Sequence, residues 1–227
     1  MDLNDALRTT GSIREFSPEP VSDQLLYDIL DDARFAPSGG NRQAWRVIVV
    51  TGDQRRAIGE IYLDAWHDYV AHLLAGLIPF SPLASPSDRA NASAQREQAV
   101  LLSNPEGFAE TIDQVPVMLI VLADLAALAA TDRDLERYQL VGGASIYPFV
   151  WSVLLSAHAH GLGGVMTTIL TRHEDQARRV LGVPDSYAVA ALVALGHPLQ
   201  RHTKLKRRAV EEFTVRDSFD GVPFSRD

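Results

Sequence analysis

The residues Ala36 to Gln43, which read APSGGNRQ, combine a serine hydroxyl, two side-chain amides and two glycines in one short stretch. The hydroxyl and amides can donate and accept hydrogen bonds, and glycines let a ligand approach the backbone N–H groups closely. This inventory suits a flat heterocycle with mixed donors and acceptors. The same residues are also typical of an ordinary helix-to-strand turn in which Asn41 hydrogen-bonds the local backbone.

Two groups of cations could bind an anion. Arg14 lies between Ser12 and Phe16, where its guanidinium could hold a phosphate, a sugar hydroxyl or an anionic ring edge. A solvated arginine is the alternative interpretation. A basic segment near the C-terminus indicates a local anion site in an acidic chain, or else a solvated face or a subunit contact. Its cations are Arg201, Lys204, Lys206, Arg207 and Arg208.

The glycines near position 163 do not form a dinucleotide-binding fingerprint. Gly161, Gly163 and Gly164 follow a predicted helix instead of opening one, and the third glycine of that motif would fall at Met166. The stretch 142–146 lacks the flanking glycines of a serine hydrolase's nucleophile elbow. We therefore expect neither a Rossmann site nor a nucleophilic serine.

We expect no metal site, because the histidines lack the spacing of ligands on one helix face. His158 and His160 are two positions apart, and His67 and His72 are five apart, whereas a helical zinc site needs a separation of four. His197 follows a predicted strand and could reach a pocket, or it could serve as a cap. The chain also has no cysteine, so any redox chemistry would need a bound cofactor.

The composition favours one globular domain over residues 1–227. Hydrophobic residues make up 46% of the chain and charged residues 22%, which are ordinary values for a packed core. The formal net charge of -8 argues against a nucleic-acid partner. The first residues resemble no signal peptide, and no apolar run is long enough to span a membrane. We expect a soluble, unsecreted, cytoplasmic protein without a membrane contact.

The first half of the chain predicts two helices, a strand and an insertion. Ser22 is a suitable N-cap for a helix that ends at Ala33, and the apolar run 47–50 predicts a strand buried on both faces. A second amphipathic helix runs from Asp53 to Leu77 and breaks near Pro79. Residues 79–104, with a helix near 96–102, are the predicted mobile segment of a lid-like insertion that spans about 62–104.

The second half continues the irregular alternation of helices and strands. We expect strands at 115–123 and 187–195, a buried helix at 142–160 that Gly161 caps, and a short helix at 173–181 that Gly182 ends. The buried helix carries Ile146, Val150, Trp151, Leu154 and Leu155 on its apolar side. No repeat or linker divides the chain, so the class is α+β.

In order and spacing, segments from about Leu7 to Phe213 resemble the nitroreductase family of FMN-dependent flavoenzymes. The resemblance implies a central mixed or antiparallel sheet flanked by helices, and an intertwined homodimer with FMN at the subunit interface. The segments are SIREF, APSGGNRQAW, VPVMLIVLAD, GASIYP, GLGGVMTTIL, LGVP, ALGHP and RRAVEEF.

The resemblance also implies roles for particular residues. Ser12 and Arg14 would contact FMN, and Arg14 would tune the reduced flavin. Met166, Thr167 and Thr168 would pass beside the isoalloxazine, with the Thr168 N–H facing flavin N5. Arg207, helped by Lys204 or Lys206, would hold the phosphate. Four residues would come from the opposite subunit: Pro37, Ser38, Gly39 and Asn41.

This chain departs from the family pattern at two places. Thr10 and Gly11 stand where one or two basic residues usually precede the serine, so one phosphate contact is missing and flavin affinity is open. Ala44 stands where a proline commonly precedes the tryptophan, which alters loop rigidity more than chemistry.

The activity that the resemblance implies is an NAD(P)H oxidoreductase with ping-pong hydride transfer through flavin N5. Nitroaromatics, quinones or similar electron-poor small molecules would be the acceptors, with NADPH or NADH as reductant. Two alternatives stay open at this point. One is a specialised flavin reaction such as dehalogenation, flavin cleavage or dehydrogenation, and the other is a flavin-binding protein without turnover.

Overall fold

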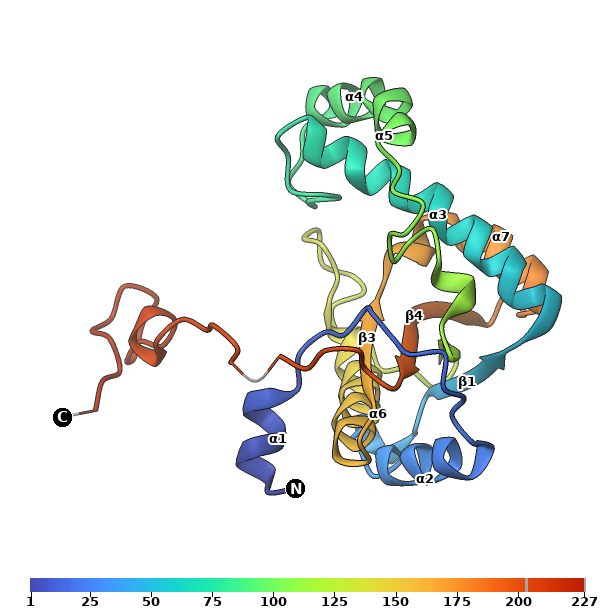
Figure 1. Cartoon of the computed structure of the whole chain (residues 1–227). Helices are drawn as coiled ribbons and strands as arrows, with labels where there is room; N and C mark the ends of the chain where they lie inside the picture. Colours follow the sequence, from blue (N-terminus) through green and yellow to red (C-terminus); the bar gives the residue numbers. More distant parts are fainter. Residues whose placement is uncertain (203, 227) are drawn as a thin grey trace.

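A four-stranded antiparallel sheet forms the centre of the molecule in the computed structural model, which describes residues 1–202 and 204–226 (Figure 1). The strand order is β1-β2-β4-β3, so β2 and β4 are central and β1 and β3 are the edges. The strands are β1 Trp45–Val50, β2 Val117–Asp124, β3 Gly163–Thr167 and β4 Tyr187–Gly196.

The sheet has a hydrophobic layer on each face because side chains of a strand alternate between faces. On β2, Leu119 and Val121 pack in one cluster, with α2 Asp23–Ala33 and α6 Tyr147–Ala159. Met118 and Ile120 pack in the other, with α3 Gly52–Leu74 and α7 Glu174–Leu181. These four β2 side chains have no exposed surface. The predicted α+β class is confirmed.

Most of the predicted elements are present with the expected ends. The Ser22 hydroxyl caps α2 by accepting a hydrogen bond from the Leu25 N–H at 3.2 Å. Gly182 ends α7 in the left-handed conformation, with φ 64°. The strands expected at 115–123 and 187–195 correspond to β2 and β4, and the long helix from position 53 corresponds to α3.

Three details of the predicted elements are wrong. The strand at 47–50 is not buried on both faces, because β1 is an edge strand and Val49 is 47% exposed. The helix expected from position 142 begins at Tyr147, since 141–145 form a 3₁₀ turn, and its Trp151 is 39% exposed. The strand β3 was not predicted, because two of its five residues are glycines, which are depleted in strands.

The insertion consists of the end of α3 and two short helices that stand away from the sheet (Figure 1). These helices are α4 Pro86–Ala94 and α5 Arg96–Leu101; only α5 was predicted. A capping box starts α4, in which Ser85 and Asp88 satisfy each other's backbone N–H groups. The insertion's boundaries and its mobility stay predictions.

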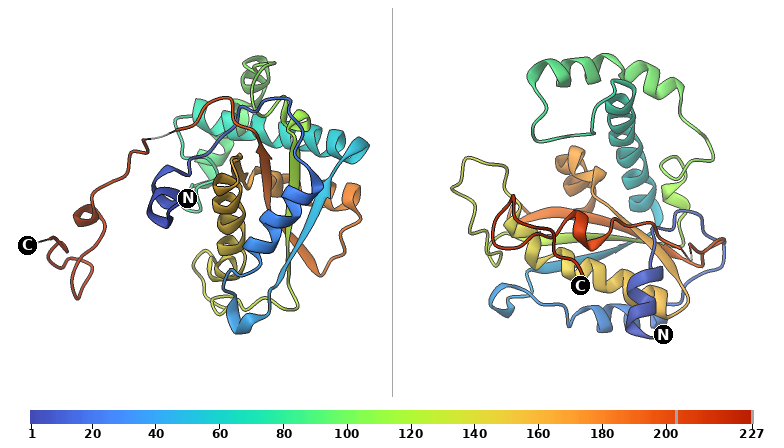
Figure 2. Two further views of the ribbon diagram at one scale, coloured as in Figure 1. Left: turned by 60° about the horizontal axis from the view of Figure 1, so that its bottom comes forward. Right: turned by 90° about the vertical axis from the view of Figure 1, so that its left-hand side faces the viewer.

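The two ends of the chain differ in how they pack. Near the N-terminus, α1 Leu3–Thr9 lies beside α6, whereas residues 204–226 leave the body as an extended arm (Figures 1 and 2). This C-terminal arm contains one short 3₁₀ helix, Val210–Glu212. No helix in the described part of the chain is both long and apolar enough to cross a membrane.

The segment 12–17 docks on the end of the sheet and depends on the glycines of β3. The Ile13 N–H donates to the Gly164 carbonyl at 2.9 Å, and the Ser17 N–H donates to the His197 carbonyl at 2.8 Å. A Cβ on Gly163 would lie 2.8 Å from Ile13 Cγ1, closer than packed carbons approach. Gly163 therefore has to lack a side chain for the segment to reach β3.

We predict that Gly163→Ala lowers the free energy of unfolding by about 1–3 kcal/mol, because the added methyl overpacks against Ile13. Denaturant unfolding measures this change. The double variant Gly163→Ala with Ile13→Ala should lose less than the sum of the two single losses, because removing the Ile13 branches relieves the conflict. Additive losses would show that the two residues do not conflict.

Candidate functional site

A cleft of about 660 Å³ lies where segment 12–17, the end of β3 and α3 meet the chain that returns from α5. Arg14 lines it together with three residues of the predicted site: Met166, Thr167 and Thr168. Arg14 is exposed, and no carboxylate of the described residues lies within ion-pair distance of it. Its charge is therefore available to a ligand.

Tyr62 supplies a protonated hydroxyl on the floor of this cleft. Its hydroxyl lies 3.1 Å from Thr167 Oγ1, and its side chain is 2% exposed. Burial raises the pKa of Tyr62, although the Thr167 hydrogen bond and the Arg14 charge oppose the shift. The phenol is thus neutral at physiological pH and can donate or accept a hydrogen bond.

The backbone at Thr168 is held by the turn that follows β3. The Thr168 carbonyl accepts hydrogen bonds from the Thr171 N–H at 3.1 Å and from its hydroxyl at 2.8 Å. Thr168 itself is exposed, immediately before the 3₁₀ turn Ile169–His173. A polar backbone position is therefore presented to the cleft in a fixed conformation.

Aromatic rings give the cleft flat walls. Trp66 and Tyr69 of α3 stack with ring centroids 4.9 Å apart and planes 9° apart, and Phe108 meets Tyr62 edge-on at 6.3 Å. These four side chains line the cleft. The sequence predicted a lid-like insertion over about 62–104 but gave these rings no role in a site. Three of them, Tyr62, Trp66 and Tyr69, lie at helical spacing on α3, a pattern that is also typical of core residues.

A charge cluster ties the insertion to the site. Arg96 of α5 forms ion pairs with Asp64 and, at 3.2 Å, with Asp68 on α3. His173, which ends the turn after Thr168, lies 3.0 Å from the same Asp64 carboxylate. The cluster joins α5, α3 and this turn. Within residues 1–202 and 204–226, no group of three His, Cys, Asp or Glu side chains could hold a metal ion.

The predicted loop at Pro37–Asn41 lies in a different cleft. Its Gly39 N–H donates to Ser145 Oγ at 3.0 Å, and the Ser38 hydroxyl accepts from the Gln43 N–H at 2.9 Å. Asn41 adopts the left-handed conformation at φ 51°. Pro37, Ser38 and Gly39 line about 340 Å³ of space that shares no residue with the Arg14 cleft. One chain therefore does not bring the two predicted halves together.

The predicted phosphate-binding cations are exposed on the C-terminal arm. Lys204, Lys206 and Arg207 do not line the Arg14 cleft, and Arg207 Nη1 donates to the Lys206 carbonyl at 2.8 Å. The arm nevertheless starts beside Gly11, where a Cβ would lie 3.0 Å from Leu205 Cδ2. The cations on either side of Leu205 thus leave the body close to Ser12.

The departures at Thr10 and Gly11 have structural explanations. Thr10 is buried, and its hydroxyl donates to the Ala6 carbonyl at 2.7 Å at the end of α1. Gly11 leaves room for Leu205 and for His202, whose Cβ would lie 3.4 Å from a Cβ at this position. A larger basic side chain at either position would disturb this packing.

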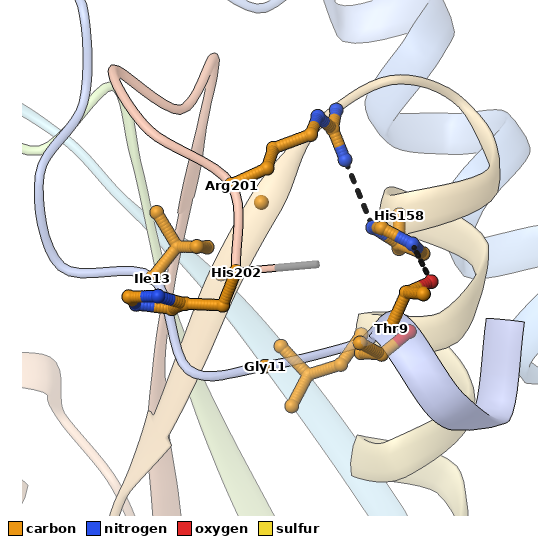
Figure 3. Close-up of a pocket in the computed structure, with 10 residues that line it drawn as sticks. Thr9, Gly11, Ile13, His158, Arg201 and His202 are labelled. Carbon is orange, nitrogen blue, oxygen red and sulfur yellow. Dashed lines mark hydrogen bonds between the residues drawn. The ribbon is translucent and has the colours of Figure 1, made fainter. Parts of the chain in front are cut away.

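Next to Gly11, His158 of α6 contacts both Thr9, at the end of α1, and Arg201, which precedes the C-terminal arm (Figure 3). Arg201 Nη1 lies 2.9 Å from His158 Nδ1, and His158 Nε2 lies 2.9 Å from Thr9 Oγ1. An arginine can only donate, so Nδ1 must accept and the proton sits on Nε2. Burial, reinforced by the Arg201 charge, lowers the pKa of His158. The folded state therefore holds this histidine neutral.

Comparisons with known proteins identify the family. The model of the nitroreductase family matches residues 7–197. A Thermus thermophilus protein named NADH dehydrogenase is 28% identical over 216 residues, which cover 95% of this chain and 96% of that one. A 4-nitrobenzoate reductase from Pseudomonas putida is 24% identical over 231 residues, 96% of this chain and 97% of that one.

A solved structure has the same fold. The FMN- and NADPH-dependent nitroreductase from Sphigopyxis sp. strain HMH superposes with a TM-score of 0.62 at 24% identity, over 96% of this chain and 100% of that one. The chain belongs to the nitroreductase family, and the predicted family and fold class are confirmed.

We predict that folding stability decreases as the pH falls below about 7, in part through His158. Because its pKa is lowered in the folded state, the unfolded chain takes up the proton first, and the loss continues until the folded histidine is also protonated. His158→Gln, which can still accept from Arg201 and donate to Thr9, should make stability less dependent on pH. Denaturant unfolding between pH 5 and pH 8 measures this, and an unchanged dependence would contradict the prediction.

Proposed function

We propose that this chain is an FMN-dependent oxidoreductase that uses NADPH or NADH to reduce nitroaromatics, quinones or similar electron-poor acceptors. The observation that carries the proposal is the cleft in which Arg14 and Thr168 meet beside stacked aromatic rings. Family membership supports it, as do the names of relatives: an NADH dehydrogenase, a 4-nitrobenzoate reductase and an FMN- and NADPH-dependent nitroreductase.

The residues present fit FMN. A volume of about 660 Å³ suits a cofactor site, which typically takes up about 300–1,000 Å³. Flat walls match a planar ring, and an unpaired guanidinium matches an anionic edge. We assign the ring to the cleft that Arg14, Met166, Thr167 and Thr168 line, with Ser12 as a further contact from the segment that pairs with β3. The Thr168 N–H is the assigned donor to N5.

When bound, FMN would supply two-electron transfer, in which electrons come from the nicotinamide in one half-reaction and pass to the acceptor in the other half-reaction of the same ping-pong cycle. The chain's own residues provide binding and electrostatics. The Arg14 charge would stabilise negative charge on the nearby ring edge, because a fixed cation acts strongly in a partly desolvated site. Tyr62 would keep Thr167 in place through its buried hydroxyl.

We further propose that two chains form a homodimer and complete each site together. The Pro37–Asn41 loop, which lies apart from the Arg14 cleft, would reach the flavin of a second copy. Several large apolar side chains on the C-terminal arm are exposed in the single chain, as expected of a surface that a partner buries. They are Val210, Phe213, Val215, Phe219, Val222 and Phe224.

The arm's cations would contribute to the phosphate site in this dimer. Lys204 and Lys206 flank Leu205, which packs at Gly11 next to Ser12. They would supply the positive charge that is missing at positions 10 and 11, and Arg207 would be the main phosphate ligand. The cytoplasmic location and the absence of a nucleic-acid partner stay predictions from the sequence.

The visible absorption spectrum of the purified protein, with FMN added and then NADPH or NADH under anaerobic conditions, tests the proposed function. We expect a bound flavin spectrum that bleaches with a nicotinamide and returns with a nitroaromatic or quinone. Bound FMN that never bleaches would favour a flavin-binding protein without turnover. Bleaching without recovery by either acceptor would favour a specialised flavin reaction.

We predict that Arg14→Ala weakens FMN binding about tenfold or lowers the two-electron potential of the bound flavin, because the ring edge loses its cation. Flavin fluorescence titration and equilibration with redox dyes measure the two quantities. Arg56→Ala is the matched control, since Arg56 is an exposed arginine near the start of α3 that pairs with Asp53 and lines neither the Arg14 cleft nor the loop cleft. Unchanged affinity and potential in Arg14→Ala would remove Arg14 from the site.

We predict that truncation after Arg208 raises the dissociation constant of the homodimer at least about tenfold, because the apolar part of the arm is lost. Sedimentation equilibrium measures the constant. Glu211→Gln and Asp220→Asn, which change exposed polar positions of the same arm, serve as controls. A full-length chain that is monomeric, or a truncated chain with unchanged dimer affinity, would contradict this role of the arm.

A further inference from the structure

A second cleft, of about 670 Å³, lies on the other side of α3 from the Arg14 cleft. Its walls come from the chain between α3 and α4, from α4, from the turn after β3 and from the segment before α6 that carries Tyr138. These segments approach one another beside the outer half of α3 (Figure 2). The cleft is continuous with the first one, since Tyr69, Thr168 and Ile169 line both.

Two arginines that form no ion pair among the described residues give this second cleft a positive charge. Arg172 from the turn after β3 and Arg89 from α4 both line it, and neither has a carboxylate of the described residues within 4.0 Å. The one acidic residue of its wall, Asp68, already lies 3.2 Å from Arg96 and 3.8 Å from His173. Asp68 therefore does not neutralise the two arginines.

The Arg172 guanidinium is also held in place before any ligand arrives. It stacks over the Phe80 ring with 4.6 Å between Cζ and the ring centroid, and His72 packs on the same ring at 4.5 Å. Stacking uses the flat face of a guanidinium and leaves its N–H edge for planar oxyanions. Arg89 is fixed through Nη1, which donates to the Ala84 carbonyl at 2.5 Å.

We propose that this second cleft binds an anionic group carried by one of the enzyme's own substrates, with Arg172 as the principal ligand and Arg89 as the second. The anion is either a carboxylate of the electron-poor acceptor or the 2′-phosphate that distinguishes NADPH from NADH. The inference rests on the proposed function, because Thr168 and Tyr69 make the cleft an extension of the flavin site. Arg172 is then a specificity-determining residue of that reaction.

The test compares substrates that differ in one charge. For the acceptor, kcat/KM is measured with 4-nitrobenzoate and with 4-nitrobenzamide, its neutral analogue; for the reductant, with NADPH and with NADH. Two ratios of kcat/KM, that of 4-nitrobenzoate to 4-nitrobenzamide and that of NADPH to NADH, are determined for the wild type and for Arg172→Gln. Loss of a charge-assisted hydrogen bond to the anionic substrate lowers its kcat/KM about tenfold, so one of the two ratios should fall about tenfold in the variant. A fall in the first ratio identifies the carboxylate, and a fall in the second identifies the 2′-phosphate.

Arg179→Gln is the matched control, since Arg179 is an exposed arginine of α7 that lines neither cleft. It should leave both ratios unchanged. Arg89→Gln should lower the same ratio as Arg172→Gln. The proposal is overturned if both ratios stay unchanged in Arg172→Gln, or if all four rate constants fall by the same factor, because the arginine would then have only a structural role.

A binding measurement separates failure of this inference from failure of the proposed function. If the wild type reduces no acceptor with either nicotinamide, the proposed oxidoreductase activity is wrong, but the cleft can still be tested. Trp66 stacks on Tyr69, which lines the second cleft, so quenching of tryptophan fluorescence should report binding there. Binding of 4-nitrobenzoate or of adenosine 2′-phosphate that weakens in Arg172→Gln supports the cleft; binding that Arg172→Gln leaves unchanged rejects it.

Discussion

The close contact between segment 12–17 and strand β3 is the constraint on which the site depends. It exists because Gly163 and Gly164 carry no side chains, so that the backbone of Ile13 can hydrogen-bond the edge of the sheet. One residue later, Arg14 enters the cleft, and Thr168 directly follows the end of the same strand at Thr167. A loss of this contact would separate the Arg14 guanidinium from the Thr168 N–H, the predicted backbone donor. Segment 12–17 also positions the chain that follows β4, because the Leu199 N–H donates to the Glu15 carbonyl.

A single chain contains only part of the proposed flavin site. Arg14 and Thr168 share a cleft, while Ser38 and Gly39 line another, and the cations of the arm are exposed beyond Leu205. In a homodimer these separate features have one explanation, since the loop and the arm of one chain can complete the cleft of its partner. The helix α3 then has two functions: its aromatic face closes the flavin cleft, and its opposite side borders the cationic cleft of Arg172. The ion pairs of Arg96 with Asp64 and Asp68 connect these clefts to the insertion.

The sequence predicted the elements whose periodicity and end signals agree, such as α2 after Ser22, β2 and β4 as apolar runs, and α7 before Gly182. It did not predict β3, because glycines that serve close packing lack strand propensity and become informative only once Ile13 is placed opposite them. Burial of the strand at 47–50 was overestimated, since an apolar run does not show whether a strand lies at an edge. For the site, Arg14 and Thr168 were predicted together from resemblance to the family. Trp66, Tyr69 and Arg172 were missed, because aromatic residues at helical spacing are usually core residues and because a cleft depends on tertiary contacts.

The most direct test of the account is subunit complementation between two variants that each damage a different half of the site. Arg14→Ala removes the cation of the Arg14 cleft, and Asn41→Ala removes the side-chain amide of the Pro37–Asn41 loop. Co-expression of both variants with separate affinity tags, followed by two-step purification, isolates the mixed dimer. If each site takes Arg14 from one chain and Asn41 from the other, the mixed dimer has one intact and one doubly damaged site. It should then bind FMN with wild-type affinity at half of its sites, while both parent variants bind weakly. A mixed dimer that binds FMN no better than its parents would contradict a site shared between chains.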